Sequence, residues 1–143
     1  MMKATVCCLL LLATELACAA EDARQLAAMP AAAQATLRAE MRANMVAVNE
    51  ILNLVTTGKL AEAGALAEKE LGVSAMGKHR ALPFEARPGP HMPPAMHAIG
   101  IEGHQAASAF ARLAAAGERD KAIAALPSLT AACVACHHAY RIR

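Results

Sequence analysis

Residues 129–141 read Leu-Thr-Ala-Ala-Cys-Val-Ala-Cys-His-His-Ala-Tyr-Arg. Within this stretch, Cys133, Cys136 and His137 have the spacing Cys-x-x-Cys-His, which is the attachment signature of c-type haem. On an α-helix, residues three and four apart share a face. The two thiols therefore project the same way, about 4.5 Å apart along the axis, and His137 points toward that face as well. One helical turn can thus provide two thioethers to the porphyrin and an axial ligand to its iron.

The same cysteine spacing also occurs in thioredoxin-like redox couples and in zinc sites. A redox couple needs a βαβ context and a dithiol at a helix start, whereas this motif ends an alanine-rich helical stretch. A zinc site needs further Cys or His at ligand spacing; His138 is adjacent, but no second cysteine pair is present after residue 20. We expect one covalent haem c, attached through Cys133 and Cys136 with His137 as the proximal ligand. A haemless metal or dithiol module is the alternative.

The first 20 residues have the features of a secretory signal peptide. A lysine precedes an apolar run at 6–13, and small residues follow at 17–20. The run is too short to span a bilayer. We expect cleavage near Ala19 or Ala20, a periplasmic location and no membrane anchor in the mature chain. Acylation of Cys18 as a lipoprotein is an alternative, although the residues before it fit that signal poorly.

The remaining chain, residues 21–143, has the length of one domain. Three of the five cysteines lie in the predicted leader, so the motif uses both of the others and leaves none for a disulfide. The formal net charge is +2 and there is no basic tract, which argues against nucleic-acid binding. Hydrophobic residues make up 57% of the chain, yet it has no Trp, two Phe and one Tyr. Such a composition disfavours a β-sheet domain and favours closely packed helices.

Apolar periodicity predicts four helices, at 32–56, 59–71, 93–116 and 118–140. The connection at 72–93 is rich in Gly and Pro. Pro127 predicts a kink or break in the last helix. This pattern predicts an all-α antiparallel four-helix bundle. The expected inward residues are Leu37, Met41, Met45, Val48, Leu52 and Val55 in the first helix, Leu60, Ala63, Ala67 and Leu71 in the second, and Met96, Ile99, Gly103, Ala107, Phe110 and Leu113 in the third.

The run from Cys133 to Arg141 resembles the end of cytochrome c-prime and its class II relatives. In that family the haem motif lies near the end of the fourth helix, and an aromatic and a basic residue commonly follow it. The segment Leu37-Arg38-x-x-Met41-Arg42-Ala43-Asn44-Met45 resembles the first helix of the family. The resemblance implies a periplasmic four-helix haem protein. Some members are low-spin, methionine-ligated electron carriers, and others are high-spin and bind small gases.

For individual residues, the resemblance implies that Met41 is the distal iron ligand. Residue type alone leaves Met45, Met92 and Met96 as competitors, because methionine on a helical stripe also fills cores. Arg38 and Arg42 are expected near the haem propionates. Tyr140 is expected to pack on the haem edge. The other five histidines are expected at the surface or in loops, outside the site: His79, His91, His97, His104 and His138.

The expected function is electron transfer with redox partner proteins, without enzymatic activity. A homodimer is an alternative to a monomer, because members of the family often pair through their first two helices. The alternative function is gas binding by a five-coordinate haem, with Met41 as an apolar wall.

Overall fold

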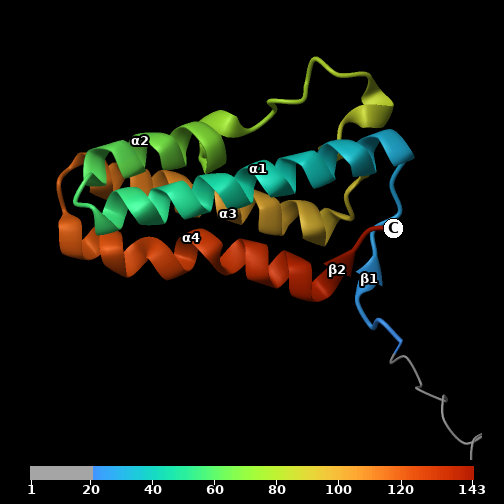
Figure 1. The fold of residues 1–143 in the computed structure, drawn as a ribbon. Helices are drawn as coiled ribbons and strands as arrows, with labels where there is room; N and C mark the ends of the chain where they lie inside the picture. Colours follow the sequence, from blue (N-terminus) through green and yellow to red (C-terminus); the bar gives the residue numbers. More distant parts are fainter. Residues whose placement is uncertain (1–20) are drawn as a thin grey trace, which may run out of the picture.

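The computed structural model describes residues 21–143, and the predicted signal peptide lies outside the described residues. In the described part the chain forms four α-helices connected in sequence (Figure 1). The prediction of an all-α chain with four helices is confirmed, and each predicted helix end agrees with the structure to one residue. The helices are α1 (Ala31–Thr56), α2 (Leu60–Leu71), α3 (Pro94–Ala115) and α4 (Arg119–Ala139).

Two short strands, which the sequence analysis did not predict, join the two ends of the described chain. β1 (Gln25–Leu26) pairs in parallel with β2 (Tyr140–Arg141). Ala27 extends this pairing by donating its backbone N–H to the carbonyl of Arg141 at 2.8 Å. The segment before α1 is therefore fixed beside the residues that follow the Cys-x-x-Cys-His motif.

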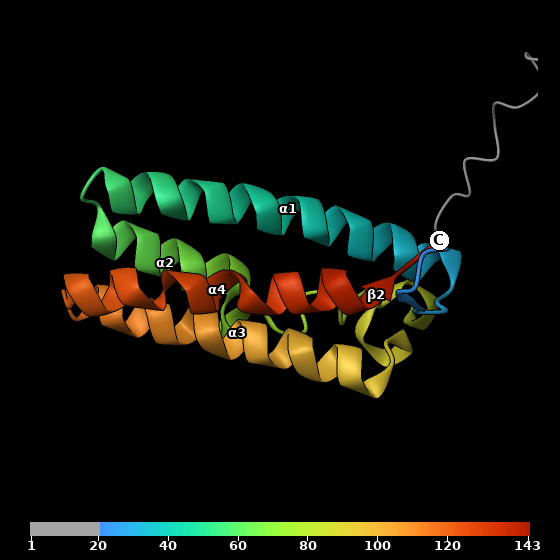
Figure 2. The same ribbon diagram turned by 90° about the horizontal axis from the view of Figure 1, so that it is seen from below.

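The helices do not all cover the full length of the molecule. α3 packs against α4 and α2, and α2 packs against α1, whereas α1 and α4 share few contacts at most (Figure 2). α2 has 12 residues and α1 has 26, so α2 is about 18 Å long and α1 about 39 Å. α2 therefore covers only one half of the molecule. The long connection follows α2, and it contains three 3-10 turns: η1 (Val73–Ala75), η2 (Phe84–Ala86) and η3 (Gly89–His91).

An acidic residue of α1 holds this connection in place. Glu40 lies 2.9 Å from Lys78 Nζ through Oε1 and 3.1 Å from His79 Nε2 through Oε2. The Glu40 side chain is largely buried, so water screens these contacts less than it screens a surface ion pair. The connection is thus bound to α1 one residue before Met41, and η2 also packs against α1.

The buried core consists of two separate clusters, although a domain of this size usually has one contiguous core. The first, which we call the α2 core, contains residues from all four helices: Ile51, Ala63, Ala67, Ala107, Phe110, Ala114, Ala122 and Leu129. The second, which we call the methionine core, lies at the other end and consists of Ala27, Met29, Ala33, Leu37 and Met96.

The predicted inward stripe of α1 is partly wrong. Met45 is 70% exposed and Leu52 is 44% exposed, whereas Ala47 and Ile51 are buried. The prediction favoured large apolar side chains, but close helix packing selects a small residue at position 47. The stripes predicted for α2 and α3 agree with the structure at their buried residues, among them Ala63, Ala67, Met96, Ala107 and Phe110.

Of the kink or break predicted at Pro127, a break is wrong, because α4 is continuous from Arg119 to Ala139; a kink stays a prediction. A proline removes one backbone hydrogen bond of a helix. Here Ala122 and Leu129, on either side of it, are both buried in the α2 core, and this packing keeps the helix intact. By length and composition α4 is also apolar enough to cross a membrane, with a mean hydropathy of 1.4 over an 18-residue window.

Candidate haem-attachment site

The motif lies in the last two turns of α4. Cys133 is exposed, Cys136 is half-buried, and both are free thiols. His137 is exposed on the following position. The backbone N–H of Tyr140 donates to the carbonyl of Cys136 and ends the helix. The regular helix therefore places both thiols and the imidazole on one side of a single turn, as the sequence analysis expected of a helical motif.

The face of α4 that carries the motif is buried earlier in the helix and becomes more exposed toward its C-terminal end. Ala122, Leu129 and Cys136 are seven residues apart, so their side chains point within about 20° of each other from one to the next. Ala122 and Leu129 are buried. Cys136 is only half-buried, and Cys133, one turn after Leu129, is exposed. An inward-facing stripe thus becomes exposed at the residues that would attach haem.

Gly100 of α3 also lies on an inward face and is uncovered. Gly100 lies seven residues before Ala107 and eleven before Ala111, both buried, so it is on the inward face of α3. A Cβ built at Gly100 would nevertheless meet no atom within 4 Å. Ile99 and Ala135 line the same shallow groove between α3 and α4. This puts the uncovered glycine at the level of the motif.

The third helix to face this region is α1. Between the buried residues Leu37 and Ile51, the inward positions Met41, Asn44 and Val48 are only half-buried. Met41 and Cys136 both pack against the methionine core. The residues present therefore fit a bulky apolar group between α1, α3 and α4, because all three helices have inward positions there without full cover.

The electrostatics of the thiols differ from those of a dithiol redox couple. Burial raises the pKa of the Cys136 thiol, and the neighbouring Cys133 raises it further. Dithiol oxidoreductases instead depend on a cysteine whose pKa is lowered. Within residues 21–143 no three His, Cys, Asp or Glu side chains are close enough to hold a metal ion.

The three residues expected around the haem have different surroundings. Tyr140 is half-buried and packs against the methionine core. Arg38 is exposed, and its Nη2 donates to Gln34 Oε1 at 3.3 Å. Arg42 is exposed and forms no hydrogen bond or ion pair with another residue of the described chain. Tyr140 and Arg38 thus lie near the motif end, and the structure gives Arg42 no partner.

Three of the other histidines have partners that hold the fold together. His79 contacts Glu40 as described, and His91 Nε2 lies 3.1 Å from the carbonyl of Phe84. His104 Nδ1 lies 2.7 Å from the carbonyl of Leu71, at the end of α2. The two remaining histidines, His97 and His138, are exposed.

Near the motif, sequence reasoning missed Met29 and Gly100. Met29 and Met96 belong to the methionine core, and Met41 and Met92 pack against it. Of the predicted competitors to Met41, Met92 and Met96 therefore share its surroundings, whereas Met45 does not. Met29 comes from a segment without helical periodicity, so nothing in its local sequence indicated a core position. Gly100 could have been found, because it continues the stripe of Ala107.

Comparison with known proteins gives no relative. No family model, no curated protein and no solved structure matches this chain.

Proposed function

We propose that this chain is a periplasmic c-type cytochrome with one covalent haem, and that it carries electrons. Its helices would form an antiparallel four-helix bundle of the cytochrome c-prime type. The observation that carries the proposal is the coincidence of a Cys-x-x-Cys-His motif with uncovered inward positions on three helices. Cys133 and Gly100 lie on helix faces that are buried elsewhere, and a porphyrin between them would complete the core.

Each motif residue has a defined role in this proposal. Cys133 and Cys136 form the thioethers, and each adds its S–H across one vinyl group, so no oxidant or reductant is needed. His137 ligates the iron through its imidazole. Bound haem supplies the one-electron redox chemistry, and the chain supplies axial ligation, burial and a partner surface.

Met41 is the proposed distal ligand. It is half-buried on the inward side of α1, and it packs against the same cluster as Cys136. A thioether ligand raises the haem potential relative to a second histidine. Glu40, which precedes Met41, is bound by Lys78 and His79, so this turn of α1 is held from outside by the long connection.

A surface for redox partners lies next to the motif. Val134 is between the two cysteines and is 67% exposed. An exposed apolar residue at this point allows a partner protein to approach the attached edge of the haem closely. The proposal includes no catalytic residue.

The first experiment asks whether haem is covalently bound. The full-length precursor is expressed in a bacterium that attaches c-type haem, and a denaturing gel is stained for haem. Thioether-bound haem survives denaturation, so the wild-type band is expected to stain and a Cys133→Ala, Cys136→Ala double variant is not. An unstained wild-type band would refute the cytochrome proposal and favour the haemless module.

The second experiment tests the distal ligand by optical spectroscopy of Met41→Ala, Met92→Ala and Met45→Ala. We expect a near-infrared methionine–iron band in the wild type, no reaction with carbon monoxide, and loss of the band in Met41→Ala alone. Met45→Ala is the control, because Met45 is exposed. A band lost in Met92→Ala would reassign the ligand. A high-spin wild type that binds carbon monoxide would make gas binding the function.

A further inference from the structure

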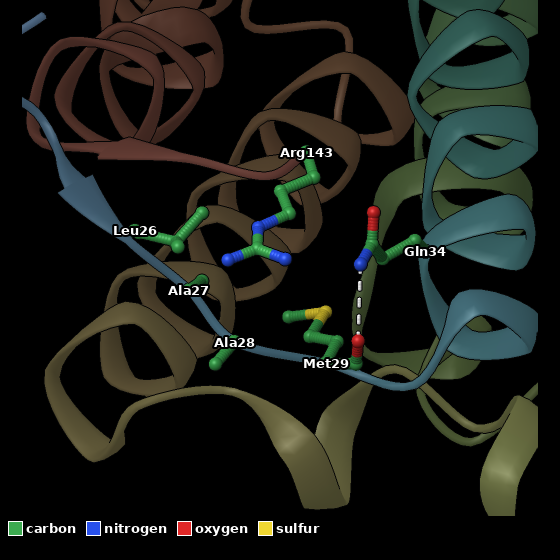
Figure 3. A pocket seen from close by; sticks show the side chains of 6 residues that line it. All are labelled: Leu26, Ala27, Ala28, Met29, Gln34 and Arg143. Atoms are coloured by element: carbon green, nitrogen blue, oxygen red, sulfur yellow. Dashed lines mark hydrogen bonds between the residues drawn. The ribbon is translucent and has the colours of Figure 1, made fainter.

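A cavity of about 170 Å³ lies beside the methionine core, where the two ends of the described chain meet. The pairing of β1 with β2 brings these segments together, and the bond from Ala27 to Arg141 extends it. Figure 3 shows the cavity from close by, with the Arg143 guanidinium between the extended segment and α1. The lining residues are Leu26, Ala27, Ala28, Met29, Gln34 and Arg143.

Arg143 is the only charged residue in this lining. Within residues 21–143 its side chain forms no ion pair and no hydrogen bond, whereas the two other arginines at this end share a carboxylate. Arg24 Nη2 lies 2.7 Å from Asp22, and Arg141 Nε lies 3.6 Å from it. Arg143 is exposed, so its guanidinium, beside an apolar wall and without an ion pair among residues 21–143, is available to a carboxylate, which it can bind through two parallel hydrogen bonds.

Gln34 connects this cavity to a second guanidinium. Its Nε2 donates to the carbonyl of Met29 at 3.0 Å, as drawn in Figure 3. Its Oε1 accepts from Arg38 Nη2 at 3.3 Å. The amide is therefore fixed at both ends, and it holds Arg38 next to the cavity. Arg143 thus lines this space, Arg38 lies next to it, and none of the lining residues has a carboxylate side chain.

The size and place of the cavity limit what it can hold. An engineered cavity of about 150 Å³ holds one benzene molecule, so this one accommodates a short carboxylate arm and not a porphyrin ring. Ala27 and Met29 line the cavity and also belong to the methionine core, on which Cys136 packs. A carboxylate arm of a haem attached at Cys136 would therefore have Arg143 as a binding partner beside this cluster.

We infer that Arg143 binds a haem propionate in this cavity, with Gln34 and Arg38 as its positioning residues. The inference rests on the proposed function, since it requires the haem. Of the two arginines expected near the propionates from the sequence, the inference retains Arg38, and it assigns Arg143 in place of Arg42. The other titratable or charged groups at this end are Asp22, Arg24, His137, Tyr140 and Arg141.

The test uses haem-loaded protein and compares Arg143→Gln with wild type. Infrared difference spectra between oxidised and reduced protein, recorded across pH, report the ionisation of the propionates. A nearby guanidinium lowers the pKa of a carboxyl group by about 1–3 units, so Arg143→Gln is expected to raise one propionate pKa by about one unit or more. The midpoint potential is expected to shift over the same pH range. Arg143→Lys should retain most of the wild-type behaviour.

Arg119→Gln is the matched control, because Arg119 is exposed at the start of α4 and distant from the cavity. Equal propionate pKa values in wild type and Arg143→Gln would overturn the inference and leave the cytochrome proposal standing. If the wild-type values move with added acetate and those of Arg143→Gln do not, the cavity binds a free carboxylate and the propionate assignment is wrong. Absence of covalent haem from the wild type would refute both proposals.

Discussion

The two ends of this molecule share three helices, α1, α3 and α4, and differ in how far they complete their own core. At the α2 end, four helices surround Phe110 and Ile51, which are fully buried. At the motif end α2 is absent, and the methionine core contains no aromatic residue. There Gly100 and Cys133 lie on inward faces and have no cover.

This difference indicates that the two ends of the molecule have different roles. Burial of apolar surface stabilises a fold by about 25 cal/mol per Å², and the α2 end obtains this from its own side chains. The motif end has small or flexible side chains instead, mainly alanine and methionine. Methionine adapts to irregular shapes, so this end suits a core that is completed by an added group.

The largest expected effect comes from filling the uncovered position on α3. Gly100→Leu places a side chain where the structure has open space. We expect haem attachment to fall several-fold, because the side chain occupies volume that the porphyrin needs. The haem-free protein should not be destabilised, since leucine has a helix propensity about 1 kcal/mol better than glycine. Quantitative haem staining and urea unfolding measure the two effects.

Ala98→Leu is the control for this variant, because Ala98 is exposed on the opposite face of α3. It should leave haem attachment unchanged. If Gly100→Leu attaches haem as well as wild type does, the open space at Gly100 is not part of the haem site, and the contrast between the two ends loses its functional meaning.

The sequence predicted the α2 end better than the motif end, and the reason is physical. Helix periodicity fixed the ends of all four helices to within one residue, and the spacing of Cys133 to His137 identified the candidate site. Periodicity describes a face and not the neighbour that covers it, so it assigned Met45 to the core. The strands β1 and β2, Met29 and Arg143 depend on pairing between residues more than 100 positions apart, which no local pattern records.

The second prediction contrasts the two thiols in haem-free protein. Burial raises the pKa of Cys136, and Cys133 is exposed. Only the thiolate is alkylated, so at about pH 8, below the ordinary cysteine pKa, Cys136 should react with iodoacetamide several-fold more slowly than Cys133. The difference should narrow as the pH rises and disappear in denaturing urea. Mass spectrometry of the labelled peptides measures both rates, and faster labelling of Cys136 would show that the methionine core does not cover it.

The smallest effect is expected where the N-terminal segment meets the motif end. A side-chain hydrogen bond from Arg24 lowers the pKa of Asp22 to about 2, assisted by a backbone hydrogen bond from Arg24 and by the charges of Arg24 and Arg141. In an unfolded chain this carboxyl has a pKa of about 3.9. Its folded pKa is lower, so its contribution to stability is present above about pH 4 and is lost as the pH falls through about 2.

Because Asp22 is exposed, salt should weaken this contribution. The protection factor for amide exchange of Ala27, whose N–H is hydrogen-bonded to the carbonyl of Arg141, measures the contribution of Asp22 to stability. Asp22→Asn should lower the protection at about pH 5 toward the wild-type value at about pH 2. Asp120→Asn, at the exposed start of α4, should not. Unchanged protection in Asp22→Asn would mean that β1 and β2 hold the two ends together without this ion pair, and that surface charge contributes little to the stability of the motif end.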